Sequence, residues 1–231
     1  LIFELDMANM HDPAVQQAVQ VLGALPEGEI LSDLLEPDTI SQLRDYLAAA
    51  GLSRDAFDRL TPGMIFLSLS SLEATRSGAR PDLGLEVRYY RKSVNDGKPS
   101  EGLETAASQL SMLSELDPDV VDALITSTIE DFETFPETMT ALVAAWKTGS
   151  SSTITELVHE PYQDAPEFYE ALLTKRNQDW IDDIEAALAT EEDVMVLVGA
   201  AHHVGKDSVI ELLKKRGLSP KQLSAAGPQP E

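Results

Sequence analysis

The stretch "VMVLVGAAHHVGKDSVIELLKKRG", residues 194–217, indicates the fold class of this chain. It begins with a continuous apolar run, and such runs are typical of a central strand that is covered on both faces. After a short loop, Asp207 or Ser208 can cap a helix, whose apolar residues have helical spacing and which ends before Gly217. The stretch therefore predicts a strand, a loop and a helix in succession, which is the unit of α/β folds.

The loop of this unit holds two of the four histidines of the chain, His202 and His203. In open α/β sheets, binding sites form beyond the carboxyl ends of the strands, and His202 follows the predicted strand there. Gly199, Ala200 and Ala201 have little bulk, so the backbone can approach a ligand closely while His202 extends over the sheet edge. We interpret His202 as a candidate functional residue; the alternative is a surface turn that happens to contain histidines.

The rest of the chain alternates between short strands and many helices. "LIFELD" at residues 1–6 has the pattern of a strand that carries Glu4 near its end. The tripeptide Gly-Leu-Glu occurs twice, and we expect the copy at 84–86 at a helix start and the copy at 102–104 at the end of a strand that leads into a helix. The remaining predicted helices occupy residues 13–51 in two pieces, 53–60, 61–76, 117–150 with a break at Pro136, and 176–189, and residues 148–153 are predicted as a flexible joint. We predict an α/β (α+β) fold with a central mixed, mostly parallel sheet flanked by helices.

The composition excludes several classes of protein. With 17 Lys and Arg against 40 Asp and Glu, the formal net charge is −23, which disfavours binding to nucleic acid or to anionic membrane surfaces. No apolar run is long enough for a membrane span. The chain contains no cysteine, so disulfides and thiolate metal sites are excluded, and any metal must be bound by oxygen and imidazole ligands.

Motifs of several enzyme classes are absent from the sequence. It contains no Gly-x-Ser-x-Gly elbow of serine hydrolases, no phosphate-binding Gly-x-x-x-x-Gly-Lys-Ser loop and no zinc-binding His-Glu-x-x-His. Trp180 and Leu188 share the apolar face of the helix predicted at 176–189, which indicates packing in the core. His11 and His159 have no motif around them, and we expect both in loops or on the surface.

Four separated stretches resemble, in order, the characteristic blocks of the TraB/PrgY/GumN family, whose relatives include the Tiki proteases. They are "FELDM" at 3–7, "LGLEVRYYRKSVNDGKPSEGLETAASQL" at 83–110, "RNQDW" at 176–180 and "VLVGAAHHVGKDSVIELLKKRG" at 196–217. Four ordered matches that cover nearly the whole chain are far more specific than one. The resemblance implies an EreA/ChaN/Tiki-like fold in a single domain, residues 1–223, with a helical insertion at about 117–170 and a disordered tail at 224–231.

The family that the chain resembles carries two Gly-x-x-His motifs. The second corresponds to Gly199-Ala200-Ala201-His202, and the first would lie upstream of Leu1. Because the chain begins inside an apolar run without an initiator Met, we expect that an upstream segment has been removed. A site built from both motifs would then be incomplete, with reduced metal affinity and activity. GumN-like relatives often carry an export signal, so we expect a periplasmic or extracytoplasmic location, with a cytoplasmic one as the alternative.

The resemblance to the Tiki branch implies a divalent-metal-dependent hydrolase that cleaves peptide bonds. The implied ligands are the imidazole of His202 and the carboxylates of Glu4, Glu86 and Glu104, a set suited to Mn²⁺, Co²⁺ or Zn²⁺. A metal bound in this way lowers the pKa of its water, and one carboxylate then acts as general base. Glu86 is therefore predicted both as a ligand and as a catalytic residue.

Arg176 and Asn177 are the remaining predicted site residues. The functional interpretation is that they orient a substrate carbonyl or stabilise an oxyanion, and the alternative is a surface charge followed by a helix-capping Asn. The expected partner is a peptide or small-molecule substrate, with the oligomeric state left open. The alternative function is a non-catalytic protein of the same fold that binds a peptide or another small ligand.

Overall fold

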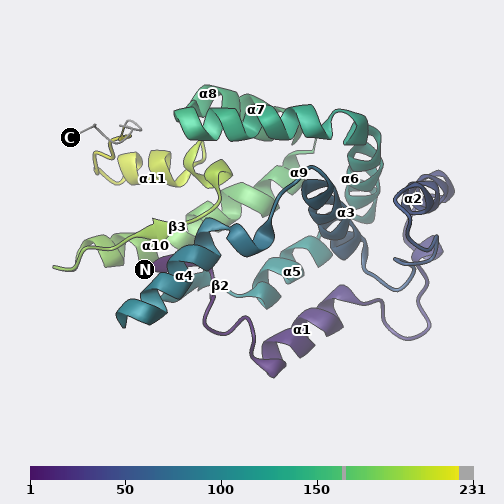
Figure 1. The fold of residues 1–231 in the computed structure, drawn as a ribbon, viewed down its shortest axis with the longest axis horizontal. Helices are drawn as coiled ribbons and strands as arrows, with labels where there is room; N and C mark the ends of the chain where they lie inside the picture. The colour runs from purple at the N-terminus through teal and green to yellow at the C-terminus, as the bar shows by residue number, and fades with distance from the viewer. Residues whose placement is uncertain (163–164, 224–231) are drawn as a thin grey trace. The chain divides into compact units, whose positions relative to one another are not determined.

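The structure is a computed structural model that describes residues 1–162 and 165–223 (Figure 1). The chain divides into two compact units, Leu1–Pro136 (unit 1) and Glu137–Glu231 (unit 2), which we describe separately. The fold class is mixed α and β, as predicted, and helices predominate. The tail predicted at 224–231 lies outside the described residues, and the single domain with an insertion at about 117–170 stays a prediction.

Unit 1 contains two short strands and a set of helices in the order expected from the sequence. The strands are β1 (Ile2–Leu5) and β2 (Glu101–Glu104). The helices are α1 (Pro13–Gly23), α2 (Pro37–Ala49), α3 (Pro62–Arg76), α4 (Leu85–Asp96), α5 (Ala106–Ser114) and α6 (Pro118–Glu130). Both copies of Gly-Leu-Glu lie where they were predicted, because Gly84 caps α4 and Glu104 ends β2 just before α5.

The two strands of unit 1 pair in parallel, with Phe3 opposite Gly102 and Leu5 opposite Glu104. The carboxyl ends of both strands therefore meet at one edge, which places Glu4 and Glu104 on neighbouring strand ends. Phe3 is completely buried, and its ring meets the ring of Tyr90 of α4 edge to face at 6.2 Å. The parallel pairing agrees with the predicted sheet type.

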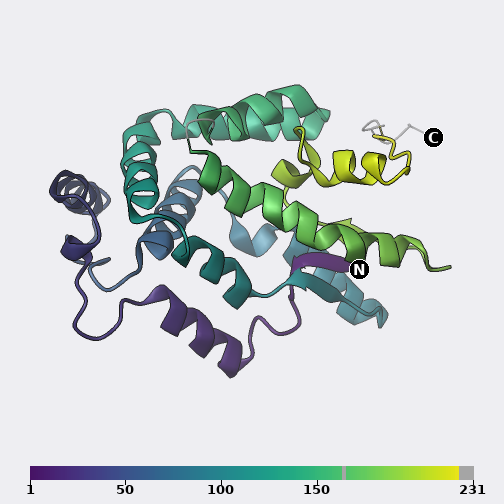
Figure 2. The ribbon, with the colours of Figure 1, turned by 180° about the vertical axis from the view of Figure 1, so that it is seen from behind.

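The helices of unit 1 bury a core made mainly of aliphatic side chains. Helix α3 packs against α6 and α5, α2 packs against α6, and α1 packs against α5 (Figures 1 and 2). The most deeply buried side chains on these helices are Leu43, Leu47, Ile65, Leu69 and Ile125. Helix α2 ends where the sequence indicated, because Gly51 adopts φ 79 and the N–H of Leu52 donates to the carbonyl oxygen of Leu47.

Unit 2 is a helical layer with one short strand. Its elements are α7 (Phe135–Thr148), α8 (Ser151–Val158), α9 (Pro166–Tyr169), α10 (Lys175–Leu188), β3 (Val196–Leu197) and α11 (Val209–Lys215). A π-helical segment, Glu170–Thr174, joins α9 to α10 in one continuous helical run. Helix α11 packs on α10 (Figure 2), and Trp180, Ile181 and Leu213 are buried there.

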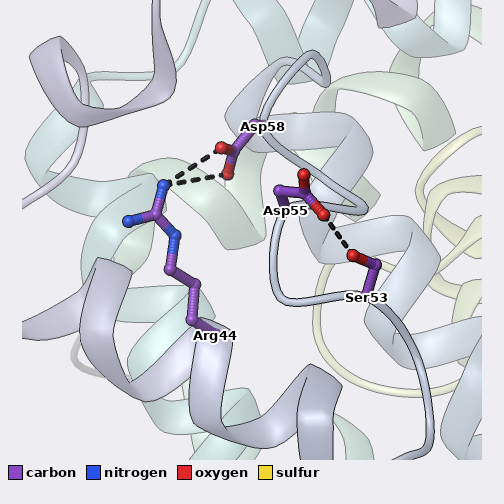
Figure 3. A network of polar contacts seen from close by, with 4 residues as sticks. All are labelled: Arg44, Ser53, Asp55 and Asp58. Atoms are coloured by element: carbon purple, nitrogen blue, oxygen red, sulfur yellow. Dashed lines mark hydrogen bonds and ion pairs between the residues drawn. The ribbon is translucent and has the colours of Figure 1, made fainter.

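The segment at 53–60, predicted as a helix, is a series of turns. The N–H groups of Ala56 and Asp58 donate to carbonyl oxygens three residues earlier, and the hydroxyl of Ser53 donates to the carboxylate of Asp55. Figure 3 shows this bond beside the ion pair of 3.0 Å between Arg44 of α2 and Asp58. Short polar side chains that bond locally compete with helix formation, and this explains the wrong prediction.

Four further predictions in the helical regions are corrected by the structure. The flexible joint predicted at 148–153 is limited to Gly149 and Ser150, because α8 begins at Ser151 and buries Ile154. The break predicted at Pro136 lies earlier, in a 3₁₀ turn at Asp131–Glu133. Leu188, predicted in the core, is 54% exposed because it is the last residue of α10.

The fourth correction concerns the alternative interpretation of Arg176 as a surface charge ahead of a helix, because Arg176 lies inside the first turn of α10 and is 3% exposed. The π-helical segment upstream explains this error, because the helical run already begins at Pro166.

A search for helices that could cross a lipid bilayer finds none in the part of the chain that the structure describes. This finding agrees with the absence of a long apolar run in the sequence.

Candidate functional site

His202 lies in the 3₁₀ turn Ala200–His203, directly after β3, as the sequence predicted. The N–H of His202 donates to the carbonyl oxygen of Gly199 at 3.0 Å, which closes the turn. Only 3% of His202 is exposed, and its ring centroid lies 4.5 Å from that of Trp180. The side chain is therefore directed into the interior of unit 2, whereas its neighbour His203 is exposed.

Asn177 contacts one of the two ring nitrogens of His202. Its Oδ1 lies 2.7 Å from His202 Nδ1, and its Nδ2 donates to the backbone oxygen of Asp207 at 2.9 Å. The bond to Asp207 sets the orientation of the amide, so the oxygen of Asn177 faces the imidazole. Because an amide oxygen only accepts, Nδ1 of His202 carries the proton in this bond.

Arg176 contacts the opposite nitrogen of the same ring. Its Nη1 lies 3.3 Å from His202 Nε2 and donates to the carbonyl oxygen of Leu172 at 2.9 Å. The guanidinium carbon is 4.9 Å from the centroid of the Trp180 ring, which is a cation–π distance. A guanidinium can only donate, so Nε2 of His202 accepts and the imidazole is neutral.

The helix places these side chains through its local geometry. Arg176, Asn177 and Trp180 lie within one turn of α10, so they share a face, and all three are at most 3% exposed. The π-helical segment Glu170–Thr174 lies directly before them. Such segments are rare and occur frequently at functional sites, because the extra residue re-aims the side chains that follow.

The structure brings two of the predicted carboxylates of unit 1 together. The amide nitrogen of Gln109 on α5 lies 3.3 Å from Glu4 Oε1 and 3.5 Å from Glu104 Oε1. Both carboxylates are partly buried, and they come from the adjacent ends of β1 and β2. The parallel pairing of the strands thus gathers two acidic side chains that are far apart in the sequence.

Glu86 has a different environment at the start of α4. Its Oε2 lies so close to Gly84 that a Cβ on Gly84 would be 3.3 Å from it, so the carboxylate folds back over the first turn of its own helix. A carboxylate at this position is stabilised by the helix dipole. The structure therefore gives Glu86 a helix-start environment that would exist without any ligand.

The side chains at these positions are of the donor types that divalent cations of the implied kind bind. His202 is neutral and uses Nε2 as its acceptor atom, which is the form in which imidazole binds metals, and Glu4 and Glu104 supply carboxylate oxygens. In residues 1–162 and 165–223, no group of three or more His, Cys, Asp or Glu side chains is close enough to hold a metal ion. The chemistry of the donors fits, and a complete ligand set is not seen within these ranges.

Sequence reasoning missed Gln109 and His159. Gln109 had a signal, because it lies one helical turn after Thr105, the residue that immediately follows the second Gly-Leu-Glu motif. His159 was expected in a loop or on the surface, but it is 8% exposed and contacts the turn that carries His202. No motif surrounds His159, so only the tertiary structure identifies it.

Comparison with known proteins gives matches over most of the chain. The family model described as "TraB/PrgY/gumN family" matches residues 1–222. The uncharacterized protein YbaP of Escherichia coli (strain K12) is 24% identical over 214 residues, which cover 93% of this chain and 76% of YbaP. A metalloprotease TIKI homolog of Amphimedon queenslandica is 28% identical over 194 residues, which cover 73% of this chain and 38% of that protein. No solved structure matches the chain.

Proposed function

Because the chain belongs to the TraB/PrgY/gumN family, we propose that it is a divalent-metal-dependent hydrolase that cleaves peptide bonds. The observation that carries the proposal is the chain of contacts from Asp207 through Asn177 to His202, which holds a buried imidazole in one tautomer. Imidazole ligands of metals are commonly oriented in this way, by a hydrogen bond from the nitrogen that does not bind the metal. The name of the Amphimedon queenslandica relative, a metalloprotease, supports the same class of chemistry.

The proposed ligands are His202, Glu4 and Glu104. For His202 the argument is the tautomer, since Nδ1–H is held by Asn177 and Nε2 is the acceptor atom. For Glu4 and Glu104 the argument is the sequence motifs, together with the shared contact to Gln109. A divalent cation, Mn²⁺, Co²⁺ or Zn²⁺, would polarise the substrate carbonyl and lower the pKa of bound water.

Arg176 and Glu86 have separate proposed roles. The guanidinium of Arg176 is held by Leu172 and Trp180, so its position is fixed and it can donate to a substrate carbonyl or to the oxyanion that forms from it. Glu86 is proposed as the general base or as a further ligand, on its sequence motif alone. Its place at a helix start favours the ionised carboxylate that either role requires.

One contact favours a second candidate function. The guanidinium of Arg176 lies on the nitrogen of His202 that a metal would use, at 3.3 Å. A cationic group beside a neutral imidazole also suits the binding of a carboxylate without any metal. The second candidate is therefore a non-catalytic protein that binds a peptide or a small acid.

The two candidates are distinguished by metal binding and peptide cleavage in the full-length protein. We would titrate it with Mn²⁺ or Co²⁺ and incubate it with a library of quenched fluorescent peptides. His202→Ala is expected to lower the metal affinity by more than about 100-fold, beyond the loss typical of residues that only support a ligand, and to abolish cleavage. His203→Ala is the matched control, because His203 is adjacent but exposed, and it should retain both properties.

Two results would contradict the proposal of a metal-dependent hydrolase. Cleavage that persists after chelation and in His202→Ala would exclude His202 as a ligand. Peptide binding that persists after chelation and leaves the peptide intact would favour the second candidate.

A further inference from the structure

His159 is a buried histidine that the proposed chemistry does not use. It follows α8, and 8% of it is exposed. Its Nε2 lies 3.2 Å from the carbonyl oxygen of Ala201, and its Nδ1 lies 3.2 Å from the hydroxyl of Tyr169. The rings of His159 and Tyr169 meet edge to face at 5.2 Å. Both polar atoms of the imidazole thus have a partner inside unit 2.

The two contacts restrict the hydrogen bonds that His159 can make. A carbonyl oxygen only accepts, so Nε2 carries the proton and donates to Ala201, and in this tautomer of the neutral imidazole Nδ1 accepts from the hydroxyl of Tyr169. Burial, and then the nearby negative charge of Asp207, raise the pKa of Tyr169, so its hydroxyl remains a donor. The direction of donation therefore runs from Tyr169 through His159 to the backbone of Ala201.

Gly205 provides an independent sign that the loop is fitted to this imidazole. Its φ is 84, a conformation that L residues with a side chain rarely adopt. A Cβ at Gly205 would lie 2.5 Å from His159 Nδ1 and 2.6 Å from its Cε1. The backbone at Gly205, just after the 3₁₀ turn, therefore lies so close to the ring of His159 that a side chain at this position would collide with it.

We propose that His159 is a positioning residue, which with Tyr169 holds the carbonyl of Ala201 and so directs the ring of His202 at Asn177. Ala201 is the residue directly before His202, and the peptide that joins them sets the direction of the His202 side chain. Tyr169 belongs to the helical run that continues into α10, so the same run that carries Asn177 also holds the loop. This proposal rests on the proposed function, but the measurement that tests it does not require the protein to cleave peptides.

The test measures the tautomer of His202 by nitrogen NMR of the imidazole in ¹⁵N-histidine-labelled protein. The chain has only four histidines, so each signal can be assigned from single variants. In His159→Leu, which loses the donor to Ala201, the ratio of His202 tautomers is expected to change by about fivefold, the effect of one hydrogen bond. His159→Gln keeps an N–H at the position of Nε2 and is expected to restore the wild-type signal.

Ile184→Ala is the matched control, since Ile184 is buried in the same unit, on α10, and takes part in none of the hydrogen bonds or ring contacts described for the two histidines. It should lower the melting temperature without altering the His202 signals. If His159→Leu does not fold, Tyr169→Phe is used in its place, because this substitution removes only the hydroxyl that contacts His159. Tyr169→Phe should alter the NMR signals of His159 and, more weakly, those of His202.

An unchanged His202 tautomer in a folded His159→Leu or Tyr169→Phe variant would overturn the proposal, as would an equal change in Ile184→Ala. A change of tautomer in a protein that cleaves no peptide would contradict the proposed function and leave the positioning role intact.

Discussion

The buried polar network around Glu73 in unit 1 and the one around His202 in unit 2 differ in the groups that they pair. In unit 1, Glu73 is 5% exposed and accepts hydrogen bonds from the hydroxyl of Tyr46 and, at 3.0 Å, from the guanidinium of Arg76. In unit 2, His202 contacts the amide of Asn177 and the guanidinium of Arg176. Burial and hydrogen bonding are therefore common to both and do not by themselves identify a functional site.

The difference lies in the charge of the partners and in the backbone that carries them. Glu73 is an acid on a regular helix, and it forms an ion pair of 3.0 Å with the cation Arg76. His202 is a base whose accepting nitrogen lies against a cation, on a turn after a strand. In the proposed function, a metal ion would bind at this nitrogen in place of the cation. Comparing the networks therefore predicts that changes in the Glu73 network affect stability alone and that changes in the His202 network affect stability and function together.

The largest effect on stability is expected from Gly205→Ala. The substitution places a Cβ at φ 84 and against the ring of His159, so it combines backbone strain with overpacking and should cost about 3 kcal/mol of unfolding free energy. Gly217→Ala has a similar φ of 88 and nothing within 4 Å, so it should cost about 1 kcal/mol from backbone strain alone. Urea denaturation of both variants measures the difference, and equal losses would show that His159 does not restrict the loop.

Asn177→Ala is expected to have the next largest effect. It leaves the Nδ1–H of His202 and the carbonyl of Asp207 without their partner in a buried region, which should cost about 2–3 kcal/mol. Gln109→Ala in unit 1 is the matched change, and it should cost less than about 1 kcal/mol, because the carboxylates of Glu4 and Glu104 are only partly buried. A larger loss in Gln109→Ala than in Asn177→Ala would reverse the ranking of the two regions.

The network around Glu73 should affect how the free energy of unfolding depends on pH in the alkaline range. Burial, with the hydrogen bond to Glu73, raises the pKa of Tyr46 from 10.0 to about 12. The unfolded chain then loses the tyrosine proton first, so the stabilising contribution is complete below pH 10 and is lost as the pH rises to about 12. Tyr46→Phe should remove this part of the decrease and leave peptide cleavage unchanged. If the unfolding free energies of the wild type and Tyr46→Phe change with pH in the same way over this range, the decrease does not come from Tyr46.

The smallest effect is expected from the ion pair of Arg44 and Asp58 (Figure 3). Its side chains are 41% and 38% exposed, and exposed pairs contribute little because solvent screens them. Asp58→Asn should lower the unfolding free energy by about 0.5 kcal/mol, and the loss should disappear in high salt. A loss comparable to that of Asn177→Ala would mean that exposed and buried networks cannot be ranked by burial.

The sequence predicted those elements whose patterns are repeated over many residues. The helix end at Gly51, the strand that begins the chain and the unit around His202 all follow from local spacing and turn residues. The pairing of β1 with β2 was not predictable as a contact, and only the family resemblance grouped Glu4 with Glu104. Local patterns carry no information about which distant strand lies alongside.

The errors have a common physical origin in competition between local and tertiary terms. Residues 53–60 have helical spacing, but Ser53 and Asp55 bond to each other and form turns. The short side chains of 148–153 suggested a joint, but burial of Ile154 supports a helix there. His159 lacks any sequence signal, because its neighbours come from two other segments: Tyr169 from α9, and Ala201 and Gly205 from the loop that carries His202.

The most direct test of the central claim is nitrogen NMR of the His202 imidazole during titration with Zn²⁺, a diamagnetic ion of the proposed ligand class, in the full-length protein. Without metal, the account predicts a single neutral tautomer with the proton on Nδ1, the nitrogen that contacts Asn177. On addition of Zn²⁺, the Nε2 signal should shift while Nδ1 remains protonated. A proton on Nε2, or saturation with Zn²⁺ that leaves both His202 nitrogen signals unchanged, would contradict the claim that this imidazole is held ready to bind a metal.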